Sequence, residues 1–287
     1  MKRSFPLLIF SLARGISSVP SPPRPLRVIL LRHGESENNV LNLISKQNYR
    51  ENRFADPALT KIGEAQAQAT ANYLSGDSCH PLLRKIDRLI VSPFLRTCQT
   101  ALPISSALGK EGIVWPDIYE VSGAYEGYEG LPGGVRGVRG LTGSEIKKRF
   151  GYQCPVEIEN GWNRHEGRES YSDAVIRIAA VASRLRELAS QQCSSGGIEG
   201  REAEAETGNE GDPRETICMV VHGDFIDILL NHLMGMPCNP AKARFRTYNT
   251  SISVIDIFHD GMVAALFTNF HEHLEGGLVK RNQLGVV

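Results

Sequence analysis

The sequence of 287 residues has no excess of charge of either sign, because Lys and Arg together number 32 and so do Asp and Glu. This balance argues against a partner such as nucleic acid that is held through a basic surface. No apolar run approaches the roughly 20 residues of a membrane-spanning helix. The six cysteines form no CxxC pair, which argues against a zinc ribbon or a disulfide-stapled miniprotein. With 41% apolar and 22% charged residues, the composition is typical of a globular enzyme.

Three segments are expected to lie outside the folded domain. Residues 1–26 are basic and contain no carboxylate, since the first acid in the chain is Glu35. This composition fits a secretory signal or an organellar transit peptide, and equally a disordered extension without an address, so we expect a cytoplasmic or organelle-targeted protein. Residues 191–215 are rich in Gly and Glu, which predicts a disordered acidic insertion. The domain is therefore expected to cover residues 27–274, with a tail at 275–287.

Short β-branched runs alternate with helical patterns along the rest of the chain. Such alternation predicts an α/β sandwich of three layers, in which a mostly parallel sheet has helices on both faces. Ligands of such folds bind beyond the carboxyl ends of the strands. The predicted strands are Arg27–Leu31, Arg88–Val91, Thr216–Val221 and a hairpin of Ser251–Phe258 with Met262–Thr268; helices are predicted from Thr60 onward and over Phe94–Leu108, Tyr171–Ala189 and Phe225–Met234.

Residues suited to phosphate binding follow three of the predicted strands. The first strand leads into Arg32 and His33, the second is followed by Arg96 one turn into a helix, and the third ends at His222 and Gly223. An arginine offers a planar fork of donors that matches phosphate oxygens, and backbone N–H groups at helix N-termini add further donors. A neutral imidazole among these cations would be a nucleophile directed at phosphorus. The pattern therefore predicts a phosphate pocket at one edge of the sheet.

Four sequence blocks resemble the histidine phosphatase superfamily in its phosphoglycerate-mutase-like branch. They are LLRHGESENN, DPALTKIGEAQAQA, VSPFLRTCQTA and VVHGDFIDILL, in the order and approximate spacing of that family. The resemblance implies that His33 is phosphorylated during turnover, and that Arg32, Arg96 and His222 form the phosphate pocket. It also implies that Asn39 contacts the phosphoryl group, and that the enzyme needs neither a metal nor another cofactor.

The proton donor to the leaving group is harder to assign from this resemblance. Members of the family carry a glutamate after the third strand, in patterns such as LxExxxGxxEG. Here the stretch Ile118–Gly127 is one residue short between its two glutamates. Glu120 is the better match, because residues 117–119 keep the phase of the strand end, and Glu126 is the alternative. Burial and a phosphodianion neighbour would raise the pKa of such an acid.

The glycine-rich run Gly127–Gly143 lacks the GK[ST] ending of a P-loop. It is predicted to form a flexible lid in which Arg136 and Arg139 contact an anionic substrate, and a plain surface loop is the alternative.

Taken together, the sequence predicts a phosphomonoesterase that hydrolyses a small phosphorylated metabolite or a phosphoprotein through phospho-His33. A short lid and the acidic insertion favour this activity over a phosphoglycerate mutase, in which the phosphoryl group returns to the substrate. A non-catalytic protein that binds phosphorylated ligands is a third alternative, although none of the expected catalytic residues is missing. The sequence specifies neither the substrate nor the oligomeric state.

Overall fold

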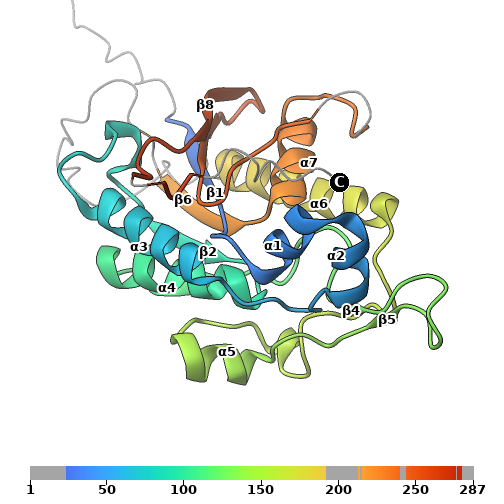
Figure 1. Cartoon of the computed structure of the whole chain (residues 1–287). Coiled ribbons are helices and arrows are strands. Elements are labelled where there is room, and N and C mark those ends of the chain that lie inside the picture. The colour runs from blue at the N-terminus through green and yellow to red at the C-terminus, as the bar shows by residue number, and fades with distance from the viewer. Residues whose placement is uncertain (1–23, 192–212, 214, 240–243, 276, 280–287) are drawn as a thin grey trace, which may run out of the picture.

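A computed structural model describes most of the chain (Figure 1), namely residues 24–191, 213, 215–239, 244–275 and 277–279. The predicted N-terminal extension and acidic insertion lie outside these residues, except at their ends. Within the predicted tail, the carbonyl of Leu278 accepts a hydrogen bond from Gln66 Nε2 at 2.8 Å. None of the helices in the described part of the chain is long and apolar enough to cross a bilayer.

A six-stranded sheet with the order β3-β2-β6-β1-β7-β8 forms the centre of the fold. The first four of these strands are parallel, and β7 runs antiparallel to both β1 and β8. This arrangement confirms the predicted α/β class with a mostly parallel sheet. The strands are β1 (Leu26–Arg32), β2 (Arg88–Val91), β3 (Gly112–Val114), β6 (Glu215–Val221), β7 (Ile252–Ile257) and β8 (Val263–Phe270).

Helices cover both faces of this sheet (Figure 1). Side chains of β1 alternate between two cores: Ile29 and Leu31 pack with α3 and α4, whereas Val28 and Leu30 pack with α6 and α7. Burial on both faces explains why the central strands read as continuous apolar runs. The helices are α1 (Glu37–Ile44), α2 (Lys46–Asn52), α3 (Lys61–Ser75), α4 (Leu95–Leu108), α5 (Gly143–Phe150), α6 (Tyr171–Gln191) and α7 (Gly223–Leu233).

The segment after β1 packs closely against the start of α3. Thr60 caps α3, as predicted, by accepting a hydrogen bond from the backbone of Gly63 at 3.1 Å. A Cβ atom on Gly34 would lie only 2.6 Å from the carbonyl oxygen of Gly63, and one on Gly63 would collide with the carbonyl of Glu35. Two glycines at this crossing therefore let the two backbones touch, which fixes the position of His33 relative to α3.

Several short elements were not predicted. α2 has no buried residue and Tyr49 as its one apolar side chain, so it lacks the apolar periodicity from which a helix is recognised. α1 is short and has no buried residue, although Val40, Leu41 and Ile44 have helical spacing. α5 does carry a sequence signal, because Thr142 and Glu145 form a capping box at its start. β3 ends at Val114, and residues 117–119 belong to no strand, so the strand phase used to choose Glu120 was wrong. α7 begins at Gly223, two residues before the predicted start, directly after the N-cap His222.

Candidate active site

A pocket of about 960 Å³ lies beyond the carboxyl ends of β1, β2 and β6. The structure brings nearly all of the predicted site residues to it. Six of them line the pocket, and His222 lies buried directly behind Arg96. The six are Arg32, His33, Asn39, Arg96, Glu120 and Gly223.

The hydrogen bonds of His33 determine which of its ring nitrogens can act as a nucleophile. Nδ1 lies 2.7 Å from the carbonyl oxygen of Gly34, which can only accept, so Nδ1 carries the proton. Nε2 accepts a hydrogen bond from Nε of Arg96 at 3.1 Å and therefore holds a lone pair. Burial and then the charges of Arg96 and Arg32 lower the pKa of His33 well below its usual value. The imidazole is thus neutral, with Nε2 as its free base.

Arg96 also contacts His222, the second histidine of the site. Its terminal nitrogen donates to His222 Nδ1 at 3.1 Å, so the proton of this ring lies on Nε2, which donates to Ser92 Oγ at 2.7 Å. Burial and then Arg96 lower the pKa of His222 well below its usual value. Burial also lowers the pKa of Arg96, to about 10, so the guanidinium stays charged at neutral pH. One buried cation therefore holds two neutral imidazoles.

Glu120 lies on the loop between β3 and the small strand β4 (Tyr125–Glu126), and its carboxyl group contacts the first turn of α7. Its Oε1 accepts from the backbone of Val121 at 2.9 Å and of Phe225 at 3.1 Å. Burial and then the charge of Asp224 raise the pKa of Glu120 to about 7, against the opposing effects of Arg96, the backbone bond from Val121 and Arg32. A carboxyl group that is protonated near neutral pH can donate a proton to a leaving oxygen.

The alternative acid, Glu126, does not line the pocket. It is paired with Arg136 at 2.6 Å across a two-stranded hairpin formed by β4 and β5 (Arg136–Gly137). Arg139 is likewise exposed and lies 3.3 Å from Glu145. Neither arginine of the predicted lid therefore reaches the pocket. The same glycine-rich run does border the pocket, through Gly127, Tyr128, Glu129, Gly134 and Val135.

Asn39 and Gly223 both line the pocket. Asn39 Oδ1 accepts from the backbone of Ser36 at 3.0 Å and from Asn249 Nδ2 at 3.2 Å, which leaves the Nδ2 amide of Asn39 to donate to a ligand. A Cβ on Gly223 would lie 3.3 Å from Nε of Arg32. The glycine therefore allows Arg32 to lie against the N-terminus of α7.

Basic residues on the outer wall of the pocket were missed from the sequence. Eight Lys or Arg residues line the pocket against four Asp or Glu, although the whole chain is neutral. The residues missed are Lys46, Arg50, Arg53, Arg168, Arg244 and Arg246.

These six basic residues differ in whether a nearby carboxylate neutralises their charge. Arg244 is paired with Asp224 at 2.7 Å and with Asp227 at 3.1 Å. Lys46 and Arg50 are exposed, and their spacing of four residues places them on one side of α2, while Arg53 follows as the C-cap of this helix. This spacing is the sequence signal that could have identified them. The outer wall gives the pocket a positive field that attracts anions.

Among the described residues, no group of three or more His, Cys, Asp and Glu is placed to hold a metal ion. The pocket holds the guanidinium groups of Arg32 and Arg96 and an unprotonated imidazole nitrogen of His33.

Comparison with known proteins shows the family to which the chain belongs. The sequence matches the family model of the histidine phosphatase superfamily (branch 1) over residues 28–198 and 202–269. It is 27% identical over 241 residues to a protein of Photorhabdus laumondii named probable phosphoglycerate mutase GpmB, covering 84% of this chain and 89% of that protein. The chain belongs to the histidine phosphatase superfamily, as the four sequence blocks indicated.

Solved structures share the fold at lower identity. The alpha-ribazole phosphatase from Shigella flexneri aligns with a TM-score of 0.52 and 19% identity, over 85% of this chain and 96% of that one. The mycobacterial glucosyl-3-phosphoglycerate phosphatase aligns with a TM-score of 0.51 and 19% identity, over 86% of this chain and 100% of that one. At this identity the comparison shows the common fold alone.

Proposed function

We propose that the protein is a phosphomonoesterase that works through a phosphohistidine at Nε2 of His33. One observation carries this proposal: Nε2 of a neutral, buried imidazole faces the guanidinium of Arg96 inside a pocket that also contains Glu120. The arrangement supplies a nucleophile, a charge that stabilises the transferring phosphoryl group and a proton donor within one site. No further catalytic group is needed for a two-step transfer.

The first step forms the phosphohistidine. Nε2 of His33 attacks phosphorus while the bond from phosphorus to the ester oxygen breaks, and Glu120 transfers its proton to that oxygen. Arg32 and Arg96 offset the charge on the equatorial oxygens, and the hydrogen bonds that Arg96 makes to the two imidazoles are exchanged for bonds to the phosphoryl group. The products of this step are the free alcohol, phospho-His33 and ionised Glu120.

The second step restores the enzyme. The carboxylate of Glu120 takes a proton from water, the water oxygen attacks phosphorus, and the bond to Nε2 of His33 breaks. Inorganic phosphate leaves with its oxygens still opposite the two arginines, and Glu120 is protonated again. A single carboxyl group with a pKa of about 7 can serve in both directions near neutral pH.

The substrate is proposed to be a small phosphorylated metabolite or a phosphoprotein side chain. Two of the structures with this fold are of phosphatases for phosphorylated small molecules, the alpha-ribazole and glucosyl-3-phosphoglycerate phosphatases named above. The volume of the pocket, about 960 Å³, accommodates a ligand of that size.

A phosphoglycerate mutase is the second candidate, favoured by the similarity to the Photorhabdus relative. In a mutase the phosphoryl group on His33 returns to a second hydroxyl of the substrate rather than to water. With 3-phosphoglycerate, a mutase would form the 2-phosphate isomer without loss of phosphate, whereas a phosphatase would release inorganic phosphate and glycerate.

The test is phosphate release from sugar phosphates, phosphoglycerates, nucleotides and phosphopeptides in the presence of EDTA, with product analysis for 3-phosphoglycerate. We expect release from at least one substrate class, together with acid-labile, base-stable phosphate on the trapped enzyme. Isomerisation without phosphate release would replace the phosphatase by the mutase. Binding of phosphorylated ligands without any turnover or phosphoenzyme would replace both by the non-catalytic alternative.

A further inference from the structure

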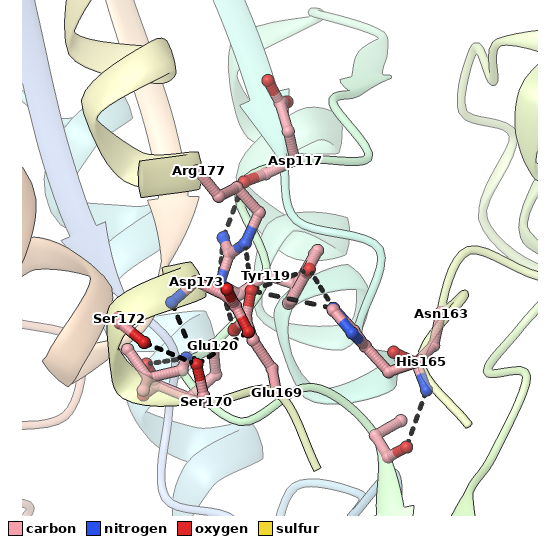
Figure 2. Close-up of polar contacts among 12 residues, drawn as sticks. Asp117, Tyr119, Glu120, Asn163, His165, Glu169, Ser170, Ser172, Asp173 and Arg177 are labelled. Carbon is pink, nitrogen blue, oxygen red and sulfur yellow. Dashed lines mark hydrogen bonds and ion pairs between the residues drawn. The ribbon is translucent and has the colours of Figure 1, made fainter. Parts of the chain in front are cut away.

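The loop that carries Glu120 is held from behind by two residues that do not line the pocket (Figure 2). No helix or strand is present between β3 and β4, and the backbone of this loop makes turn hydrogen bonds, from Ile118 to Trp115 at 3.5 Å and from Gly123 to Glu120 at 3.0 Å. Arg177 of α6 donates from one terminal nitrogen to the carbonyl of Asp117 at 2.8 Å and to the carbonyl of Tyr119 at 3.1 Å. Its guanidinium thus fixes the backbone immediately before Glu120.

Glu169 holds the other side of the same loop. Its backbone N–H donates to the carbonyl of Ser122 at 3.1 Å. Its carboxylate accepts two bonds from Arg177, at 2.8 and 2.7 Å, and one from the hydroxyl of Tyr119 at 3.0 Å (Figure 2). The backbone on both sides of Glu120 is therefore tied to one ion pair.

This ion pair is buried, so folding has to remove both of its charges from water. Apolar side chains in the same place would not carry this cost in free energy. The carboxylate of Glu169 is 1% exposed and the side chain of Arg177 is 12% exposed. Buried ion pairs contribute little net stability, because desolvation offsets their attraction. Such a pair instead fixes the relative positions of the groups that it bonds, because a bidentate ion pair with further hydrogen bonds has a single favourable arrangement. Ser122, with φ of +85°, is held in the left-handed region that residues other than glycine rarely adopt.

On the pocket side of the loop, the carboxyl group that this ion pair positions contacts α7. The carboxyl group of Glu120 accepts a hydrogen bond from the N-terminus of α7, through Phe225. α7 packs against α6, the helix that carries Arg177, in the same core. The acid is thus located by α7 in front and by Arg177 with Glu169 behind.

We propose that Arg177 and Glu169 are positioning residues, which hold the backbone on either side of Glu120 so that its carboxyl group reaches the leaving oxygen. The inference rests on the proposed function, because it assigns the pair to the step in which Glu120 donates its proton. Displacement of a catalytic group by about 1 Å costs on the order of 100-fold in rate. Loosening the loop should therefore mainly affect reactions that need this proton.

The test compares Arg177→Gln with wild type on two esters. For an alkyl phosphate, whose alkoxide leaves badly, kcat/KM should fall by about 10- to 100-fold. For p-nitrophenyl phosphate, whose phenolate leaves without help, the rate of the first p-nitrophenolate burst should stay within about threefold. In a Glu120→Gln background, the same substitution should change kcat/KM for the alkyl ester by less than about threefold, because the group being positioned is gone.

A matched control separates positioning from loss of stability. Arg186 lies on the same helix and also donates to two carbonyls, those of His232 at 3.3 Å and Leu233 at 3.0 Å, but at the far end of α7. Arg186→Gln should leave the ratio of kcat/KM for the two esters unchanged, and its melting temperature shows what the loss of two bonds to backbone carbonyls costs by itself. Since Arg177→Gln leaves a buried carboxylate unpaired, the double variant with Glu169→Gln provides a form without that charge.

Two outcomes would overturn the positioning role while leaving the proposed function intact. One is an equal loss on both esters in Arg177→Gln and in the double variant. The other is that Arg177→Gln lowers kcat/KM for the alkyl ester by as large a factor in the Glu120→Gln background as it does in wild type. If wild type instead forms no phosphoenzyme, the proposed function itself fails. If Glu120→Gln shows no dependence on the leaving group, the proton donor is another residue, and the positioning role of Arg177 fails with that assignment while the phosphatase activity stands.

Discussion

Nε of Arg96 lies 3.1 Å from Nε2 of His33 and donates a hydrogen bond to it. In the proposed mechanism this lone pair is the nucleophile, and the cation that caps it also stabilises the transferring phosphoryl group. Burial and then the charge of Arg96 keep the imidazole unprotonated, and a phosphate oxygen can replace the imidazole as the acceptor of its hydrogen bond. The proposed mechanism thus couples the nucleophile to phosphate binding through one side chain.

The first prediction concerns His33. His33→Ala should abolish both turnover and phosphoenzyme formation, because His33 is the only histidine among the described residues that line the pocket. Acid-labile, base-stable phosphate is measured after incubation with radiolabelled substrate and a rapid quench. His259→Ala, in the exposed turn between β7 and β8, serves as the control and should behave as wild type. Label on the His33→Ala protein would show that the nucleophile lies elsewhere.

The sequence was sufficient for the parts of the site that follow buried strands. Arg32, His33, His222 and Gly223 come at or directly after the ends of β1 and β6, and the parallel topology brings these ends together. An apolar run predicts the strand, and the strand then places the polar residues at its end.

Contacts between distant segments could not be predicted in the same way. Arg177 contacts the carbonyls of Asp117 and Tyr119, about 60 positions earlier in the chain, and no local pattern announces such a pair. α2 has no buried face, so neither the helix nor the basic side that it turns to the pocket was foreseen. Glu120 was selected on a strand phase that the structure does not have, and what places it at the pocket is its contact with α7.

The second prediction is a pH dependence with a definite sign. The pKa of Glu120 is raised to about 7, so the acid is protonated below that pH and loses its proton above it. The pKa of His33 is far below its usual value, so the nucleophile is neutral throughout this range. For an alkyl phosphate, kcat/KM should therefore fall above about pH 7, approaching tenfold per pH unit.

In Glu120→Gln this alkaline decline should disappear, because the titrating group has been removed. The profile is measured from pH 5 to 9 at constant ionic strength, since the substrate phosphate itself titrates near pH 6 and affects the acid side. An alkaline decline that persists unchanged in Glu120→Gln would assign the titration to another group.

The third prediction concerns the basic side of α2. Lys46 and Arg50 line the outer pocket, and both are exposed. Each exposed charge pair is worth up to about 1 kcal/mol, so replacing both residues by Gln should raise KM about three- to tenfold for a substrate with a second anionic group. The value of kcat should change little, because neither residue lies at the reacting phosphate.

Two comparisons check that this effect is local. p-Nitrophenyl phosphate has no second anionic group, so its kinetics should be nearly unaffected in the Lys46→Gln/Arg50→Gln variant. Lys147→Gln/Lys148→Gln changes the net charge equally on α5, outside the pocket, and should leave KM unchanged for both substrates. Equal effects of the two double variants would mean that only the overall charge of the protein matters.

The last prediction separates the phosphate-binding charge from the acid. Arg96→Ala removes the cation that contacts both His33 and His222, so kcat/KM should fall by about two to three orders of magnitude for every ester alike. Glu120→Gln removes proton donation, worth about two to four orders of magnitude, and only where the leaving group needs the proton. Formation of phospho-His33 from p-nitrophenyl phosphate should then be nearly normal. Hydrolysis of the phosphohistidine should be slow in that variant, because the base that activates water is also missing, and a burst of p-nitrophenolate should appear. Equal losses for Glu120→Gln on the alkyl and nitrophenyl esters would show that the acid is another residue.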